Sequence, residues 1–199
     1  MSFSASDWIL RKLSAYRGFG YVLPFGLMAV VSHGEWEHHS ILWPLGFVVI
    51  LPGVLIRLWG TKHIGRRMPW VRKGKHLITT GPYAIVRNPL YIGNIMIAIG
   101  LSLFSELVWF VPIVFIYLFI LYHLVARYEE KKLSERWGDE YRVYMREVPR
   151  WIPKFGGLGE AWTGGFKWKD TLRSEVPSFY VINFAVLIFV LKGFINHMK

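Results

Sequence analysis

Residues 89–126 of this chain read PLYIGNIMIAIGLSLFSELVWFVPIVFIYLFILYHLVA, and this stretch decides the fold class. Glu106 supplies its one Asp, Glu, Lys or Arg side chain. The runs on either side of that glutamate, 89–105 and 107–126, are each close to the roughly 17 to 25 residues that cross a hydrocarbon core of about 30 Å. Since the two runs meet at Phe104, Ser105 and Glu106, with no longer connection between them, the sequence predicts an antiparallel helical hairpin whose two free ends return to one face of a membrane.

Three further apolar runs, at about 18–32, 41–56 and 176–191, extend this pattern. The chain of 199 residues is 53% hydrophobic and 17% aromatic, with a mean hydropathy of +0.32, which is too apolar for an ordinary soluble domain of this length. We therefore predict an all-α integral membrane helical bundle of about five transmembrane helices, in a single domain over 1–199. The run 18–32 is short and contains Pro24, so a re-entrant or interfacial helix is an alternative there.

The basic residues are distributed unevenly along the chain. The formal net charge is +11, and Lys and Arg are concentrated at 11–17, 62–87 and 127–173, whereas the connections 33–40 and 105–106 contain none. The positive-inside rule then predicts a cytosolic N-terminus, cytosolic long polar segments and a C-terminus on the opposite side. Since the basic excess is explained by orientation and by attraction to anionic headgroups, we expect membrane lipids and no nucleic acid as partners. Cysteine is absent, which excludes disulfides, thiolate metal ligands and a cysteine nucleophile.

The predicted outer loop at 33–40, HGEWEHHS, is a candidate metal site. His33, His38 and His39 lie close in sequence to Glu35 and Glu37, and imidazole and carboxylate groups are common metal ligands. A solvated interfacial loop accounts for the same residues without a metal, and we expect no metal site.

The polar segment after the hairpin, EEKKLSERWGDEYRVYMREV at 129–148, has the periodicity of an amphipathic helix. Leu133, Trp137, Tyr141, Tyr144 and Val148 recur at spacings of three and four residues, which places them on one helical face. We expect a cytosolic amphipathic helix that is interrupted at its one glycine. The prolines of the following VPRWIPK end this helix.

The stretch TTGPYAIVRNPLYIGN at 79–94 leads into the first helix of the hairpin. Asn88 is a preferred N-cap residue and Pro89 a preferred first helical residue, so the helix is predicted to start there. The free N–H groups of this helix start and the guanidinium of Arg87 favour a carboxylate or phosphate. Glu129 and Glu130 add negative charge to the C-terminal end of the other hairpin helix, which favours a cation.

A ligand that carries both a carboxylate and positive charges would satisfy both ends of the hairpin. S-adenosylmethionine has this layout, since it contains a carboxylate, an ammonium, a sulfonium and an adenine, and Tyr83 and Tyr91 offer ring faces to an adenine or an onium group. The same residues also fit a simpler interpretation. In it Gly-Pro-Tyr is a plain turn, Arg87 is a snorkelling membrane anchor, and the two glutamates form a solvated helix end.

Two motifs, LITTGPYAIVRNPLYIG at 77–93 and EEKKLSERWGDEYRVYMREVPRWIP at 129–153, resemble the isoprenylcysteine carboxyl methyltransferase family, with its bacterial relatives and the phospholipid N-methyltransferases. The resemblance covers about 70–154 and leaves an extra C-terminal span at about 176–195. It implies an integral membrane methyltransferase that binds S-adenosyl-L-methionine from the cytosol and a lipophilic or amphiphilic acceptor from the bilayer. The cofactor-binding residues that it implies are Lys75, His76, Leu77, Ile78, Tyr83, Asn88, Pro89, Leu90, Tyr91 and Glu129.

Methyl transfer from a sulfonium depends on positioning, electrostatics and exclusion of water, so we expect no catalytic nucleophile. We assign Glu129 to orienting the cofactor or acceptor and Arg87 to holding an anionic group, and we expect Glu129, Glu130 or a tyrosine to take the acceptor's proton. The acceptor is left open between a lipid amine, a lipophilic carboxylate and a small thiol. A reductase of the sterol-reductase type with a nicotinamide cofactor and a non-enzymatic membrane scaffold are the alternative functions.

The chain departs from the family pattern at three positions. Asn88 stands where many members have histidine, and Lys75 stands at another common histidine position, with His76 one place late. Val125 replaces an arginine that some members direct toward a prenylcysteine carboxylate, and Arg127 is out of register. This last departure argues against a prenylcysteine acceptor. Span residues such as Trp59, Trp109 and Tyr117 are expected to line the acceptor cavity.

Overall fold

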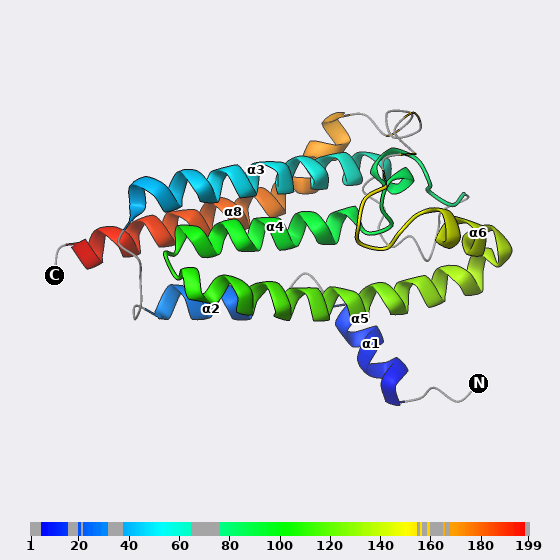
Figure 1. Ribbon diagram of the computed structural model, residues 1–199, viewed down its shortest axis with the longest axis horizontal. Helices are drawn as coiled ribbons and strands as arrows, with labels where there is room; N and C mark the ends of the chain where they lie inside the picture. Colours follow the sequence, from blue (N-terminus) through cyan, green and yellow to red (C-terminus); the bar gives the residue numbers. More distant parts are fainter. Residues whose placement is uncertain are drawn as a thin grey trace.

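The computed structural model describes residues 5–15, 20, 22–31, 38–64, 76–154, 156, 159, 165 and 168–197. Within these residues all regular structure is helical, which confirms the predicted all-α fold, and the long helices lie side by side (Figure 1). In chain order the helices are α1 Ala5–Ala15, α2 Val22–Val30, α3 His39–Ile64, η2 Gly81–Ala84, α4 Pro89–Phe104, η3 Val108–Phe110, α5 Val111–Trp137, α6 Asp139–Glu147 and α8 Trp168–His197.

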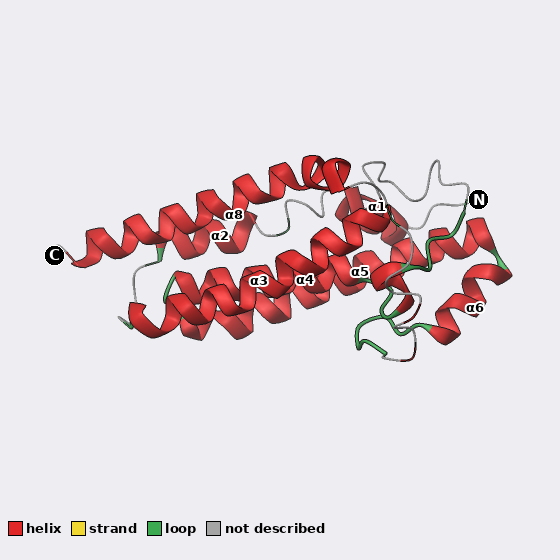
Figure 2. Ribbon diagram, turned by 90° about the horizontal axis from the view of Figure 1, so that it is seen from above, coloured by secondary structure: helices red, strands yellow, loops and turns green. Residues whose placement is uncertain are grey.

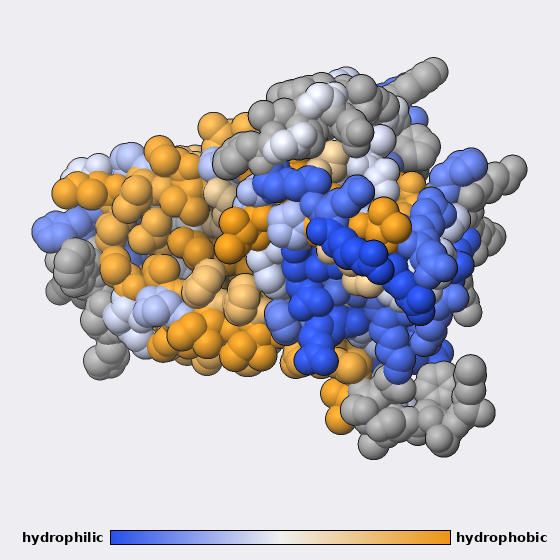
Figure 3. Space-filling view, turned by 45° about the vertical axis from the view of Figure 1, so that its right-hand side comes forward, coloured by the Kyte–Doolittle hydropathy of each residue, from blue (hydrophilic) through white to orange (hydrophobic). Residues whose placement is uncertain are grey.

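Three of the described helical segments are long and apolar enough to cross a membrane. They are Ser40–Ile64 in α3, Val108–Trp137 in η3 and α5, and Trp168–Gly193 in α8. Helix α4 is apolar but shorter. Hydrophobic residues cover one part of the surface in Figure 3, and hydrophilic residues gather toward the end that carries α6. The chain is therefore an integral membrane protein.

The first predicted span, 18–32, contains the short helix α2. Its nine residues rise about 14 Å, which is about half the thickness of a hydrocarbon core. Helix α2 lies alongside α8 (Figure 2). Residues 18, 19, 21 and 32 are outside the described part of the chain, so the count of five spans stays a prediction.

Helices α4 and α5 form the predicted antiparallel hairpin. In the turn, the hydroxyl of Ser105 donates to the carbonyl of Ser102 at 2.8 Å, and buried Glu106 has a φ of +62°. The free ends of α4 and α5 reach the end of the molecule that carries α6 and α1, whereas α8 finishes at the other end (Figure 1). The free ends of the hairpin and the C-terminal end of α8 thus lie at opposite ends of the bundle, as predicted. The assignment of one end to the cytosol stays a prediction.

A row of glycines allows α3 and α4 to pack closely. Gly46 and Gly53 on α3 are seven residues apart, as are Gly93 and Gly100 on α4. A Cβ atom on Gly53 would lie 2.9 Å from the carbonyl oxygen of Gly93, and a Cβ atom on Gly100 would lie 2.7 Å from that of Gly46. Since these distances are shorter than van der Waals contact, glycine is required, as in small-residue interfaces between membrane helices.

The segment after the hairpin is a helix broken at one glycine, as predicted. Helix α5 continues to Trp137, Gly138 follows with a φ of +54°, and α6 then begins. Trp137 packs against a buried cluster that joins the end of α5 to α6. The cluster consists of Leu133, Tyr141, Tyr144 and Val148.

Two backbone hydrogen bonds join the segment after α6 to the segment before α4. The amide of Arg87 donates to the carbonyl of Pro149 at 2.9 Å, and the amide of Lys154 donates to the carbonyl of Ile85 at 3.1 Å. The two sequence motifs, some sixty residues apart along the chain, therefore lie side by side at the free ends of the hairpin.

Candidate functional site

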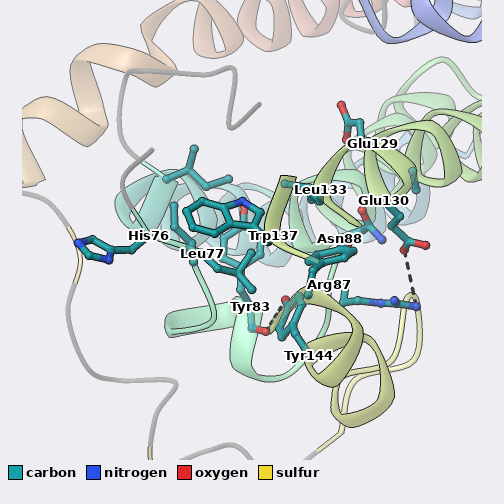
Figure 4. A pocket seen from close by; sticks show the side chains of 14 residues that line it. His76, Leu77, Tyr83, Arg87, Asn88, Glu129, Glu130, Leu133, Trp137 and Tyr144 are labelled. Carbon is teal, nitrogen blue, oxygen red and sulfur yellow. Dashed lines mark hydrogen bonds and ion pairs between the residues drawn. The ribbon is translucent and has the colours of Figure 1, made fainter. Parts of the chain in front are cut away.

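A cavity lies where the two motifs meet (Figure 4). The space within it is about 600 Å³, part of it open to solvent. Its walls come from the end of α3, the segment 76–88, the last turns of α5 and one face of α6. The lining residues are Ile64, His76, Leu77, Ile78, Tyr83, Arg87, Asn88, Ala126, Glu129, Glu130, Leu133, Trp137, Tyr141 and Tyr144.

Glu130 is held by two arginines. Arg150 donates from Nε to Oε1 at 2.9 Å and from Nη2 to Oε2 at 2.6 Å, a bidentate geometry that fixes both side chains. Arg87 Nη2 lies 3.6 Å from Oε1, the ion pair drawn in Figure 4. The hydrogen bond to Glu130 raises the pKa of Arg150. Glu130 is therefore an anchor between α5 and the segment after α6.

Glu129 is buried and accepts hydrogen bonds from two other helices. Tyr91 OH on α4 donates to Oε2 at 2.8 Å, and Ser14 Oγ on α1 donates to Oε1 at 3.3 Å. The Tyr91 ring stacks on the ring of Tyr122, with centroids 4.6 Å apart. Helices α1, α4 and α5 together hold this carboxylate at the wall of the cavity.

Arg87 brings a buried positive charge to the cavity. Its side chain is 11% exposed, and its Nε has no hydrogen-bond partner among the described residues. A buried donor left in this state costs about 1 to 3 kcal/mol, and in native proteins such a group calls for a partner such as a ligand, ion or water. The cavity therefore offers a charged donor to an anion.

Aromatic side chains supply much of the remaining wall. Trp137, Tyr141 and Tyr144 line it together with Tyr83, and Tyr144 OH donates to the carbonyl of Tyr83 at 2.8 Å. Burial raises the pKa of Tyr141 and of Tyr144 above the ordinary value near 10. Both phenols are therefore neutral at physiological pH, where they present ring faces and O–H groups and do not act as bases.

Most of the predicted site residues lie around this one cavity. His76, Leu77, Ile78, Tyr83, Arg87, Asn88 and Glu129 line it. Pro89 and Leu90, in the first turn of α4, are not among the lining residues, and Tyr91 reaches the cavity only through Glu129. Lys75 lies outside the described residues. The binding and catalytic roles of all these residues stay predictions.

The structure corrects one local expectation, the capping of α4 by Asn88. Asn88 occupies the N-cap position and Pro89 begins α4, but the Asn88 side chain makes no capping hydrogen bond. Its Nδ2 donates instead to the carbonyl of Arg150 at 3.3 Å, because the segment after α6 lies beside it. Trp109 and Tyr117 are 48% and 37% exposed and are not among the residues that line this cavity, and their place in an acceptor cavity stays a prediction.

Sequence reasoning missed Arg150 as the partner of Glu130. Nothing in the sequence separates Arg150 from the other basic residues at 127–173, because its role depends on the two backbone hydrogen bonds that fold this segment back. The helical spacing of Trp137, Tyr141 and Tyr144 did predict one shared face. The sequence did not predict that these residues line the cavity, because this depends on the packing of α6 against Tyr83.

The structure describes only residues 38–40 of the loop at 33–40, in which we expect no metal site. Residues 32–37 lie outside the described part of the chain, so the interpretation of His33, Glu35 and Glu37 stays a prediction. In the described residues, no group of three or more His, Asp or Glu side chains is placed to hold a metal ion.

The chain is similar to two bacterial metal-resistance proteins and to a sterol reductase. It is 29% identical over 128 residues to the nickel-cobalt-cadmium resistance protein NccN of Alcaligenes xylosoxydans xylosoxydans, covering 63% of this chain and 57% of the relative. For the cobalt-zinc-cadmium resistance protein CzcN of Cupriavidus metallidurans, the identity is 27% over 137 residues, 67% of this chain and 61% of the relative. The Delta(14)-sterol reductase of Mus musculus is 28% identical over 163 residues, 68% of this chain and 39% of the reductase.

The chain thus spans less than two thirds of the length of each of these relatives. No solved structure matches it. Residues 42–140, about half of the chain, match the profile of the phospholipid methyltransferase family. The matched segment contains the whole α4–α5 hairpin and all of the residues that line the cavity except Tyr141 and Tyr144. The chain therefore belongs to the phospholipid methyltransferase family.

Proposed function

We propose that this protein transfers a methyl group from S-adenosyl-L-methionine to a lipophilic or amphiphilic acceptor at the membrane. Family membership supports methyl transfer in general. One observation of the structure carries the choice of cofactor. Arg87 lines the cavity with a buried Nε that has no hydrogen-bond partner among the described residues, and Glu129 lines the same cavity.

The chemistry of the lining residues fits such a cofactor. A carboxylate fits the forked guanidinium of Arg87, and ammonium or sulfonium groups fit the carboxylate of Glu129 and the faces of Trp137 and Tyr141. When bound, the cofactor supplies a methyl group activated by its sulfonium. The chain contributes orientation at Arg87 and Glu129, and the apolar and aromatic walls exclude water from the reacting atoms.

Among the groups expected to take the acceptor's proton, the geometry favours Glu129. Glu130 is engaged by Arg150 at both oxygens, so it is committed to an ion pair. Tyr141 and Tyr144 have raised pKa values and stay neutral. Glu129 Oε1 and Oε2 accept hydrogen bonds from the hydroxyl groups of Ser14 and Tyr91, and Glu129 lines the cavity, so its carboxylate is placed to take a proton from an acceptor bound there.

Calorimetric titration of the purified protein in detergent with S-adenosylhomocysteine tests the proposal. We expect the Arg87→Ala and Glu129→Gln variants to bind at least tenfold more weakly, since a hydrogen bond to a charged group contributes about 1.5 to 3 kcal/mol. Arg127→Ala is the matched control, because Arg127 is exposed on the same helix as Glu129. Equal affinity in all four proteins contradicts the assignment of both residues.

The similarity to a sterol reductase makes a nicotinamide cofactor the competing possibility. Thermal shift with reduced nicotinamide dinucleotides and with S-adenosylhomocysteine, on the same preparation, separates the two. Stabilisation by the nicotinamide alone would contradict methyl transfer. Incubation of membranes with radiolabelled S-adenosylmethionine, followed by identification of the labelled lipid-soluble product, then defines the acceptor.

A further inference from the structure

A second cavity lies within the membrane-spanning part of the bundle, between α2, α3, α4 and α8. The empty space within it is about 350 Å³, which includes space open to the surrounding medium. Three polar side chains line it, namely Arg57, Asn94 and Ser178, and the other lining residues are apolar. The apolar ones are Phe25, Ile97, Leu101, Val181 and Ile182.

The polar end of this cavity is organised around an ion pair between α3 and α8. Arg57 Nη2 donates to Glu175 Oε2 at 2.8 Å and to Ser178 Oγ at 2.9 Å, and Arg57 Nη1 donates to Asn94 Oδ1. Thr61 Oγ1 donates to Glu175 Oε1 at 2.7 Å. The side chains of Arg57 and Glu175 are only 14% and 9% exposed.

The ion pair lies inside the spans, close to the end of the bundle that carries the first cavity. Arg57 is seven residues from the end of the span Ser40–Ile64, and Glu175 is seven residues into the span Trp168–Gly193, about 10 Å along each helix. Ionisable side chains inside spans are costly and usually serve a function. At this depth the polar end of a membrane lipid joins its acyl chain, so a neutral ion pair here lies within reach of that part of the lipid.

The cavity also reaches the lipid-facing surface. Val181, which lines it, is 45% exposed. Because Glu175 compensates the charge of Arg57, the polar end presents guanidinium, amide and hydroxyl groups without a net charge, and the guanidinium already donates to Glu175, Asn94 and Ser178. Such a site recognises uncharged or zwitterionic groups with oxygen acceptors better than a bare anion.

A chain of contacts connects this cavity to Glu129 in the first one. Asn94 Nδ2 donates to Tyr122 OH at 3.1 Å, Tyr122 stacks on Tyr91, and Tyr91 donates to Glu129. Asn94 is thus linked to Glu129 through the two stacked tyrosines.

We propose that the cavity between α3, α4 and α8 binds the oxygen-bearing polar end of a membrane amphiphile, whose chain lies along Ile97, Leu101 and Val181. Helix α8, which contributes Ser178, Val181 and Ile182 to the cavity, lies outside the segment that matches the family. The further identification of the amphiphile with the methyl acceptor rests on the proposed function.

Photolabelling of the full-length protein in detergent tests the site. The probe is a phosphatidylethanolamine with a diazirine in its acyl chain, and unlabelled phosphatidylethanolamine or hexadecane serves as competitor. We expect labelled peptides that contain 97–101 and 181–182, and labelling reduced at least fivefold by the unlabelled lipid but not by hexadecane. Equal competition by hexadecane, or labelling spread evenly over all lipid-facing helices, would overturn the proposal.

Two variants with a matched control sharpen this test. The double variant R57M/E175M replaces the ion pair by apolar side chains of similar size, which avoids leaving one buried charge unpaired, and Val181→Trp fills the mouth of the cavity. We expect each to lower competable labelling at least fivefold, whereas Leu187→Trp, at an exposed position on the same helix, leaves it unchanged. Wild-type labelling in both variants overturns the proposal.

Calorimetry with S-adenosylhomocysteine on the same proteins separates this proposal from the proposed function. Loss of labelling with unchanged cofactor affinity supports a distinct lipid site. Absence of cofactor binding in the wild-type protein, with competable labelling intact, contradicts the methyltransferase proposal and leaves the lipid site standing.

Discussion

Arg150 donates hydrogen bonds to both carboxylate oxygens of Glu130, at 2.9 Å and 2.6 Å, and thereby links the segment after α6 to the end of α5. The two residues are twenty positions apart, and Glu130 is buried while the Arg150 side chain is 28% exposed. The same carboxylate also faces Arg87 at 3.6 Å. The geometry of the cavity therefore depends on a carboxylate that we do not assign to the chemistry.

We expect Glu130→Gln to lower the stability of the protein by about 1 to 3 kcal/mol, since it leaves two arginines without a counter-charge. The measurement is the midpoint of thermal unfolding in detergent. Glu135→Gln is the control, because Glu135 is exposed and its ion pair among the described residues is with Lys132, one turn away on the same helix, a kind of pair that contributes little. Equal shifts in the two variants contradict the anchoring role.

Tyr91→Phe removes the hydroxyl that donates to Glu129 and keeps the ring that stacks on Tyr122. We expect affinity for S-adenosylhomocysteine or methyl transfer to fall about tenfold or more, as is usual for a lost hydrogen bond to a charged group. Tyr122→Phe keeps the bond to Glu129 and loses the one from Asn94, so its effect should be smaller. An effect of Tyr122→Phe as large as that of Tyr91→Phe would show that Glu129 is positioned in another way.

Gly53→Ala places a methyl group 2.9 Å from the carbonyl oxygen of Gly93, so α3 and α4 must separate. We expect a loss of about 1 to 3 kcal/mol, the usual cost of overpacking, seen as a lower thermal midpoint. Gly26→Ala in α2 meets nothing within 4 Å and should be neutral or slightly stabilising, because alanine is the better helix former. Similar losses at both positions would rule out close helix packing as the cause.

Stability should fall in alkaline solution through the buried phenol of Tyr141. Burial raises its pKa in the folded state, while the unfolded chain titrates near 10. The free energy of unfolding is therefore unaffected by the ionisation of this phenol below about pH 10. It declines as the pH rises further, because the unfolded state then releases a proton that the folded state keeps. Tyr141→Phe should weaken this decline, by up to about 1.4 kcal/mol per pH unit.

Unfolding of the wild type and of Tyr141→Phe is compared between pH 8 and 11.5. Identical pH dependence in the wild type and in Tyr141→Phe would show that this phenol ionises equally in both states.

Much of the arrangement around the first cavity follows from local sequence. The turn at 104–106 between two apolar runs is enough to predict the hairpin, and the spacing of Leu133, Trp137 and Tyr141 is enough to predict the helical face. The glycine row was missed although its signal was present, as a seven-residue spacing in both α3 and α4. The partner of Glu130 and the contact of Asn88 with Arg150 could not be predicted, since both arise where distant segments pair through their backbones.

The sequence by itself determined which segments are apolar helices, where the chain turns between them and which motif residues gather at one end, because helix length, periodicity and turn residues act locally. Only the tertiary structure decided how far two of the spans extend. In the sequence, one apolar run ends at 56, next to Arg57, and another begins at 176, next to Glu175, so these two charges are expected to lie at the ends of the spans. Helices α3 and α8 continue through both residues, because a charge inside a membrane is tolerated when a partner from a distant part of the chain neutralises it.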